Sequence, residues 1–296
     1  MQLARLSIFL EGHRYIGQFV KSIVVIPASN VSSNLLGIVG LHLPALERLE
    51  WVSWSGRDLI AAPEAADRPA LRSLKLSIHD RGVPCETPSA YFDLSTLTTL
   101  EINIPDTLLQ FERLLRDVSD LLTTLSILNI ECEDLPRVLS AIRRFDRLFS
   151  LSLIIWRSTS PLPAGFLAAF RSLRHLRLAH DDIGPALSEP FPSLETLVIT
   201  YPADDYQGHQ EDGFTATHSL RRNVASVCRI AKEFPKRFPA LRTIGLDPPY
   251  EAMSFAAEAA PQVVGLVEIA QQLRAAGFCF VDGVGTPWRP EWEQTV

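Results

Sequence analysis

Apolar side chains recur along this chain in a three-point pattern, Leu-x-x-Leu-x-Leu, about every 25 residues. Nine full copies begin at Val20, Leu46, Leu71, Leu97, Leu125, Leu148, Leu173, Leu194 and Leu241, and a partial copy comprises Leu3, Leu6 and Ile8. The intervals between full copies are 26, 25, 26, 28, 23, 25, 21 and 47 residues, the last being about two periods. Six copies also share a lead-in such as FPSL or LPAL, which chance matches would not share.

Each copy predicts one strand whose three apolar side chains point inward, followed by a loop and a helix. A fixed period of about 20–29 residues with this pattern is typical of leucine-rich repeats, in which neighbouring units stack to form one continuous core. We therefore predict an α/β fold, a leucine-rich-repeat solenoid. This right-handed βα horseshoe would carry a parallel sheet on its concave face and helices on its convex face. We expect a single domain over residues 1–296, with about ten repeats.

The segments between the strands support the helical half of the repeat. Apolar residues at three- and four-residue spacing predict helices over 107–122, 134–145, 160–170, 218–234 and 261–277. A strand is expected over 278–281, within an irregular C-terminal end at 278–296, and the Gly-rich 283–286 is expected to be a turn. The acidic segment 201–217 interrupts the period and is predicted to be a loop insertion. We leave open whether it binds a partner or is a spacer.

Alternation along each strand assigns a face to every residue. With the first residue of each copy as position 1, positions 3, 5 and 7 are expected on the concave face. In the fifth copy these positions are Ile127, Asn129 and Glu131. Aromatic residues near position 9 suggest binding hot spots at the rim, although they could equally cap the core. The candidate partner-binding residues are Trp54, His79, Trp156, His175, Arg177, Tyr201, Asp204, Asp205, Tyr206 and Tyr250.

Composition narrows the class of partner. The net charge is −6 and Lys and Arg form no dense run, which argues against nucleic-acid binding. No apolar stretch is long enough to span a bilayer, so we expect no membrane partner. The four cysteines lie far apart and are expected to be free, buried or half-buried thiols in a reducing compartment. With no signal peptide evident, we predict a cytoplasmic or nuclear location.

Residues that could carry chemistry are sparse. The sequence has no nucleotide-binding loop, nucleophile elbow or zinc-protease motif, so we expect no cofactor, no bound metal and no enzyme activity. Two alternatives to a binding protein stay open. One is an enzyme that uses His175, His180 and Asp181. The other is an orphan repeat protein without a dedicated partner.

The lead-in segments FPSLETLVI (191–199), FPALRTIGL (238–246), FRSLRHLRL (170–178) and RPALRSLKL (68–76) carry a family resemblance, together with GQFVKSIVVIP (17–27). They resemble leucine-rich-repeat proteins of the ribonuclease-inhibitor-like class, in particular the repeat region of fungal F-box/leucine-rich-repeat proteins. The resemblance implies a non-enzymatic scaffold that recognises substrates for a cullin-type ubiquitin ligase. In that family an N-terminal F-box docks a Skp-type adaptor. No F-box precedes Val20, so adaptor binding would need one upstream, and the Asn or Cys usual at position 9 is absent.

Overall fold

The computed structural model describes residues 9, 12–25, 42–54, 68–78, 88–103, 108–156, 162, 165–179, 185–187, 189–200, 234–247, 266–282 and 285–291. It shows an α/β fold in which ten strands form one sheet, ordered from β1 to β10 as in the chain. All the strand pairs with a described register are parallel. The chain divides into two compact units. The first unit comprises Met1–Asn129 and Pro136–Arg147, and the second comprises Ile130–Leu135 and Leu148–Val296.

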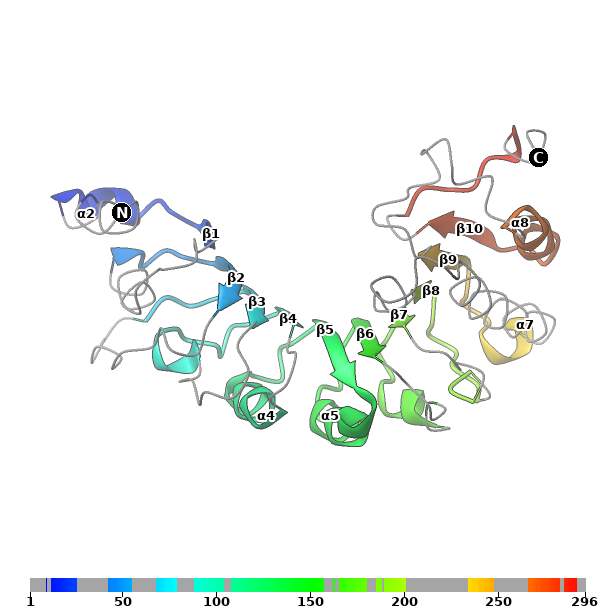
Figure 1. Ribbon diagram of the computed structural model, residues 1–296, viewed down its shortest axis with the longest axis horizontal. Helices are drawn as coiled ribbons and strands as arrows, with labels where there is room; N and C mark the ends of the chain where they lie inside the picture. Colours follow the sequence, from blue (N-terminus) through cyan, green and yellow to red (C-terminus); the bar gives the residue numbers. More distant parts are fainter. Residues whose placement is uncertain are drawn as a thin grey trace, which may run out of the picture. The chain divides into compact units, whose positions relative to one another are not determined.

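The first unit holds the first strands and two longer helices. Its strands are β1 (Ser22–Val25), β2 (Arg48–Trp54), β3 (Ser73–Ile78), β4 (Thr99–Asn103) and most of β5 (Thr124–Glu131). Its helices are α2 (Arg14–Gly17), the 3₁₀ turn η2 (Pro88–Ala90), α4 (Leu108–Asp117) and nearly all of α5 (Leu135–Ile142). Within this unit α4 and α5 lie on one side of the strands (Figure 1).

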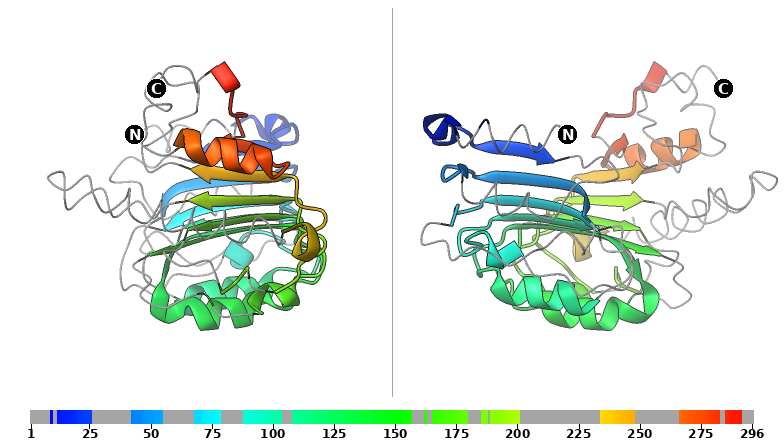
Figure 2. Two further views of the ribbon diagram at one scale, coloured as in Figure 1. Left: turned by 90° about the vertical axis from the view of Figure 1, so that its right-hand side faces the viewer. Right: turned by 60° about the vertical axis from the view of Figure 1, so that its left-hand side comes forward.

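The second unit repeats the arrangement, with one longer helix and three short helical segments among its described residues. Its strands are β6 (Ser150–Trp156), β7 (His175–Ala179), β8 (Thr196–Thr200), β9 (Thr243–Asp247) and β10 (Cys279–Asp282). Its helical segments are η3 (Cys132–Asp134), η4 (Phe166–Ala169), α7 (Phe234–Arg237) and α8 (Leu266–Ala275). The neighbouring strands β7, β8 and β9 run side by side, with α8 packed beside β10 (Figure 2).

Positions 1, 4 and 6 of the repeat form the core of each unit. In the repeat of β7 they are Leu173, Leu176 and Leu178, each no more than 1% exposed. The register of the sheet aligns the same positions of neighbouring repeats, so that Leu176 faces Leu151 on one side and Leu197 on the other. Each such side chain stabilises the fold by about 1.5–3 kcal/mol relative to an exposed one. No repeat can bury these residues alone, which explains why the period is kept.

The shared lead-in forms a turn that delivers the chain into each strand. The amide of Leu241 donates to the carbonyl of Phe238 at 3.0 Å, and that of Leu173 donates to Phe170 at 3.1 Å. Both phenylalanines are buried beneath the turn. Pro239 occupies the second position of its turn, where its fixed φ favours the bend. The lead-in therefore recurs because it closes a turn and fills the core at once.

The structure corrects the register of the fifth repeat. Thr99 pairs with Thr124 and Ile102 with Ile127, so position 1 of this repeat is Leu122 and not Leu125. Ile127 therefore lies in the core at position 6, 2% exposed, and its assignment to the concave face was wrong. The error arose because Leu122-x-x-Leu125-x-Ile127 and Leu125-x-x-Leu128-x-Ile130 both match the pattern. With the corrected start the two adjacent intervals become 25 and 26 residues instead of 28 and 23.

Most predicted helices form, but they are shorter than predicted. Helices α4, α5 and α8 lie within 107–122, 134–145 and 261–277, whereas the described residues of 160–170, which are 162 and 165–170, include the 3₁₀ turn η4 and no α-helix. Of the predicted helix 218–234 only Phe234 is described, as the first residue of α7. The predicted strand 278–281 appears as β10, and Gly285 follows it in a left-handed turn with φ +88°.

Candidate functional site

One side of the sheet carries the side chains at positions 3 and 5, which we call the sheet face. Because strand residues alternate between faces, these side chains point away from the core at positions 4 and 6. All of those described are half-buried or exposed except Gly245 and Val281. Position 3 consists of Ser22, Arg48, Ser73, Thr99, Thr124, Ser150, His175, Thr196, Thr243 and Cys279. Position 5 consists of Val24, Glu50, Lys75, Glu101, Ser126, Ser152, Arg177, Val198, Gly245 and Val281.

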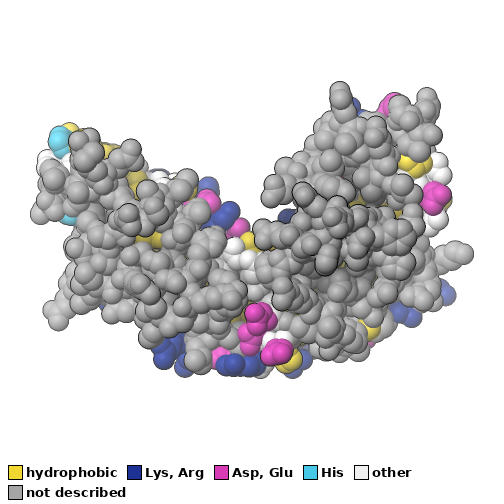
Figure 3. Space-filling model, in the orientation of Figure 1, with side chains coloured by type: hydrophobic (Ala, Val, Ile, Leu, Met, Phe, Trp, Pro, Cys, Tyr) yellow, Lys and Arg dark blue, Asp and Glu magenta, His cyan; other side chains and the backbone are white. Residues whose placement is uncertain are grey.

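A row of alternating charges crosses the sheet face of the first unit. Lys75 Nζ lies 3.2 Å from Glu101 Oε1 and 3.4 Å from Glu50 Oε1, so one cation bridges carboxylates on both neighbouring strands. Burial alone would lower the pKa of Lys75, but Glu101 and then Glu50 stabilise its charged form and raise that pKa. Basic and acidic side chains accordingly lie next to one another near these strands in Figure 3.

Beside this row, several polar groups of the first unit have no side-chain partner among the described residues. Arg48 is exposed at position 3 and forms no hydrogen bond or ion pair with its guanidinium group in that part of the chain. The hydroxyls of Ser73 and Thr99, on the next two strands, likewise make no bond to described residues. These groups form a half-exposed set of donors and acceptors that a protein partner could use.

The sheet face of the second unit is more apolar. The ring of His175 meets that of Phe149 edge-on at 4.7 Å, and Phe149 is 39% exposed. Arg177 Nε donates to Thr200 Oγ1 at 2.9 Å, which satisfies the hydroxyl of a nearly buried residue. Further along, a Cβ on Gly245 would lie 3.0 Å from Val198. A methyl group there would press on the side chains of Val198 and Val281, which glycine lets pack across the strand.

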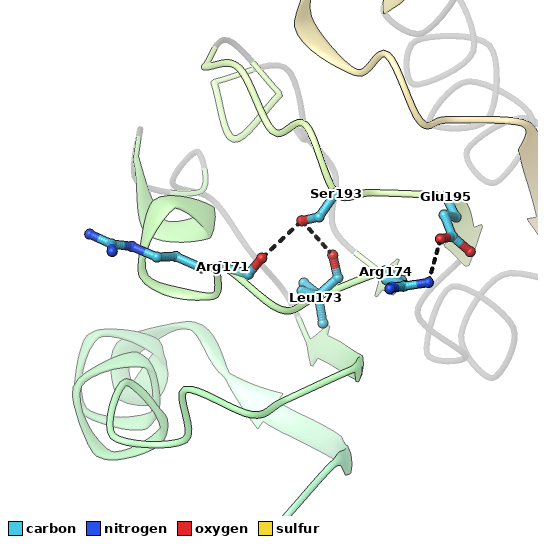
Figure 4. Close-up of polar contacts among 5 residues, drawn as sticks. All are labelled: Arg171, Leu173, Arg174, Ser193 and Glu195. Atoms are coloured by element: carbon cyan, nitrogen blue, oxygen red, sulfur yellow. Dashed lines mark hydrogen bonds and ion pairs between the residues drawn. The ribbon is translucent and has the colours of Figure 1, made fainter.

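The side chains at position 2 of successive repeats form a second row, which lies at the amino ends of the strands. Arg174 Nη1 contacts Glu195 Oε1 at 2.9 Å in the second unit, as Figure 4 shows. Beside this pair the Ser193 hydroxyl lies 3.0 Å from the carbonyl oxygen of Leu173 and 3.1 Å from that of Arg171. In this repeat, the polar residue before position 1 thus ties the lead-in turn to the preceding repeat. Thr96 does the same in the first unit, donating to the carbonyl of Leu71.

Of the predicted partner-binding residues, the structure places His175 and Arg177 together on β7. Trp54 and Trp156 are the last residues of β2 and β6, and their side chains lie outside the described part of the molecule. His79, Tyr201, Asp204, Asp205, Tyr206 and Tyr250 also lie outside the described residues, as do His180 and Asp181. Of the proposed enzyme site only His175 is described, and its ring contacts Phe149.

Two side-chain interactions at or beside the sheet face were not predicted from the sequence. Glu50, Lys75 and Glu101 were placed at position 5, and their alternating signs in consecutive repeats could have predicted the ion-pair row. The contact of Phe149 with His175 could not be predicted, because position 2 had not been assigned to a face.

The expectation of buried or half-buried cysteines was wrong for Cys279, which is exposed because it falls at position 3 of β10.

No family model matches the sequence, and no curated protein matches it. Within the described part of the chain, no three or more His, Cys, Asp or Glu residues are grouped so that they could hold a metal ion. None of the described helices has the length and apolar character that crossing a membrane requires.

Proposed function

We propose that this chain is a leucine-rich-repeat solenoid of the ribonuclease-inhibitor-like class that binds a protein partner through its sheet face. The observation that carries the proposal is the half-exposed polar surface of the first unit, where Arg48, Ser73 and Thr99 lie beside the Glu50–Lys75–Glu101 row. Charge patterns of this kind fix the orientation of a partner and reject partners with the wrong charges. The parallel strands and the 25-residue period support the repeat class.

A large side chain placed on the sheet face should block the partner without disturbing the core. Ser126, at position 5, is half-buried on the sheet face, whereas Ser140 is exposed on α5. Proteins captured from cell extract by the parent chain should also bind the Ser140→Arg variant and be lost from the Ser126→Arg variant. Capture of the same proteins by both variants would remove the sheet face as the binding surface.

Substrate recognition for a cullin-type ubiquitin ligase is the specific form of the proposal, and it rests on the family resemblance. It requires a Skp-type adaptor to bind the native protein. Co-purification of an adaptor with the protein isolated from its own cells tests this form. If no adaptor co-purifies while other partners do, the chain is a scaffold outside the ligase system.

A further inference from the structure

A cavity of about 530 Å³ opens in the first unit at the amino ends of its strands, apart from the sheet face. Consecutive lead-in turns form its wall, and its lining includes Lys21, Glu47, Arg72, Pro44, Ala70 and Leu121. Its volume falls within the range of about 300–1,000 Å³ that ligand sites occupy. The first three of these residues share position 2 of successive repeats and present a positive, negative and positive charge in order.

Two of these three charged side chains form a close ion pair. Lys21 Nζ contacts Glu47 Oε1 at 3.1 Å, and this hydrogen bond is the main reason that the pKa of Glu47 lies below its usual value. The guanidinium of Arg72 is exposed and makes no hydrogen bond or ion pair with any described residue. Arg72 also helps to lower the pKa of Glu47 through its charge, but the lining holds two cations and one carboxylate, and this net positive charge favours an anionic group in the occupant.

The rest of the wall favours an aliphatic group beside that anion. Leu121 is 44% exposed at the cavity, and Pro44 and Ala70 add further apolar surface. The two threonines of the lining already donate their hydroxyls to backbone carbonyls, Thr96 to Leu71 and Thr98 to Arg72.

The backbone groups at the amino ends of these strands already form hydrogen bonds with one another, so a partner segment cannot pair with them as an added strand. The carbonyl of Glu47 accepts the amides of both Arg72 and Ser73, at 2.8 and 3.0 Å, and the carbonyl of Arg72 accepts those of Thr98 and Thr99. An occupant must therefore be recognised through side chains and not by strand addition.

We propose that this cavity binds an acidic segment of a partner protein, with a carboxylate on Arg72 and a neighbouring aliphatic side chain against Leu121. A carboxylate can accept two parallel bonds from a guanidinium, which gives both strength and orientation. The site goes beyond the sheet-face proposal, because none of its lining residues belongs to positions 3 or 5.

The test measures which peptides the full chain retains from a library of short acetylated peptides. Each peptide has a central glutamate between randomised residues. A second library with a central lysine serves as the control. The glutamate library should be retained and enriched in Leu, Ile or Val within two residues of the glutamate. The best peptide should bind Arg72→Gln about three- to tenfold more weakly than the parent, the range for an exposed to partly buried charged bond. Leu121→Ser should also weaken it.

Arg48→Gln is the matched control, since Arg48 is an exposed arginine of the same unit whose guanidinium forms no hydrogen bond or ion pair with the described residues, lies on the sheet face and does not line the cavity. It should leave peptide affinity unchanged. The inference is overturned if no glutamate peptide binds below about 1 mM, if the lysine library is retained equally, or if Arg48→Gln weakens binding as much as Arg72→Gln. Loss of protein capture by Ser126→Arg with intact peptide binding would show that the two surfaces act separately.

Discussion

Lys75 illustrates how one side chain can join three repeats. Its ammonium group contacts Glu50 and Glu101 on the two flanking strands, so both carboxylates stabilise its charge when all three strands are in register. The pKa of Lys75 is consequently raised in the folded chain despite its partial burial. Since all three side chains are more than one-third exposed, solvent screening limits the stabilisation to about 0.5–1 kcal/mol.

This raised pKa predicts a dependence of stability on alkaline pH. A lysine with a raised folded-state pKa contributes its full stabilisation below the unfolded-state pKa and loses it as pH rises through the folded-state pKa. The difference in unfolding free energy between the parent and Lys75→Met should stay constant near neutrality and shrink above about pH 10.4. Urea titrations at several pH values measure it, with Arg48→Met as the control. A difference that does not change with pH would contradict the ion-pair row.

Ile127 and Ser126 test the register of the fifth repeat. Ile127 is 2% exposed at position 6, whereas Ser126 is half-buried on the sheet face. Ile127→Asn should lower the unfolding free energy by about 3–4 kcal/mol, because it opens a cavity and buries an unpaired amide. Ser126→Asn should change it by less than about 1 kcal/mol. The reverse order in urea unfolding would restore the alternative start at Leu125.

At the scale of elements, the end of α8 shows how closely a local motif can be predicted. Gly277 was predicted to end this helix, and the structure gives it φ +86°. The amide of Phe278 donates to Leu273 and that of Gly277 to Arg274, which is the Schellman pattern of helix termination.

Gly277→Ala should therefore destabilise the chain by about 1 kcal/mol, since a Cβ has open space but the left-handed backbone disfavours alanine. Gly12 offers a matched control, because a Cβ there also meets open space and its backbone is not left-handed. Gly12→Ala should be neutral or stabilising by a few tenths of a kcal/mol. Thermal unfolding of the two variants compares them, and equal effects would refute the role of the backbone at Gly277.

Strands were predicted from the sequence more reliably than helices. Three apolar positions and a shared lead-in specify each strand, because the residues of the lead-in close a turn and fill the core. The helical half has no such constraint. Residues 160–170 have apolar spacing similar to 134–145, yet the described residues 165–170 form a 3₁₀ turn that follows Gly165, whose φ is +75°. Side-chain partnerships across repeats, such as Phe149 with His175, depend on register and could not be predicted from spacing.

At the scale of the whole molecule, the repeat separates mostly buried positions from mostly half-exposed ones. Positions 1, 4 and 6 supply most of the core in both units, while the described side chains at positions 3 and 5 are half-buried or exposed, except Gly245 and Val281. Because the repeat pattern specifies the buried positions and not the half-exposed ones, the sequence predicts the strands well and the class of partner poorly. The regular spacing constrains the buried residues, whereas the residues of the sheet face share only their position in the repeat and differ in side-chain type.

The most direct test of this account is the rate of thiol labelling at adjacent positions of one strand. The four native cysteines would be replaced by serine, and a single cysteine introduced at Ser152 (position 5) or at Leu153 (position 6) of β6. We predict that the Ser152→Cys thiol reacts at once, while the fully buried Leu153→Cys thiol reacts at least about 100-fold more slowly until the protein is unfolded. Equal rates at the two positions in the folded protein would contradict the alternation on which both the core and the proposed binding face depend.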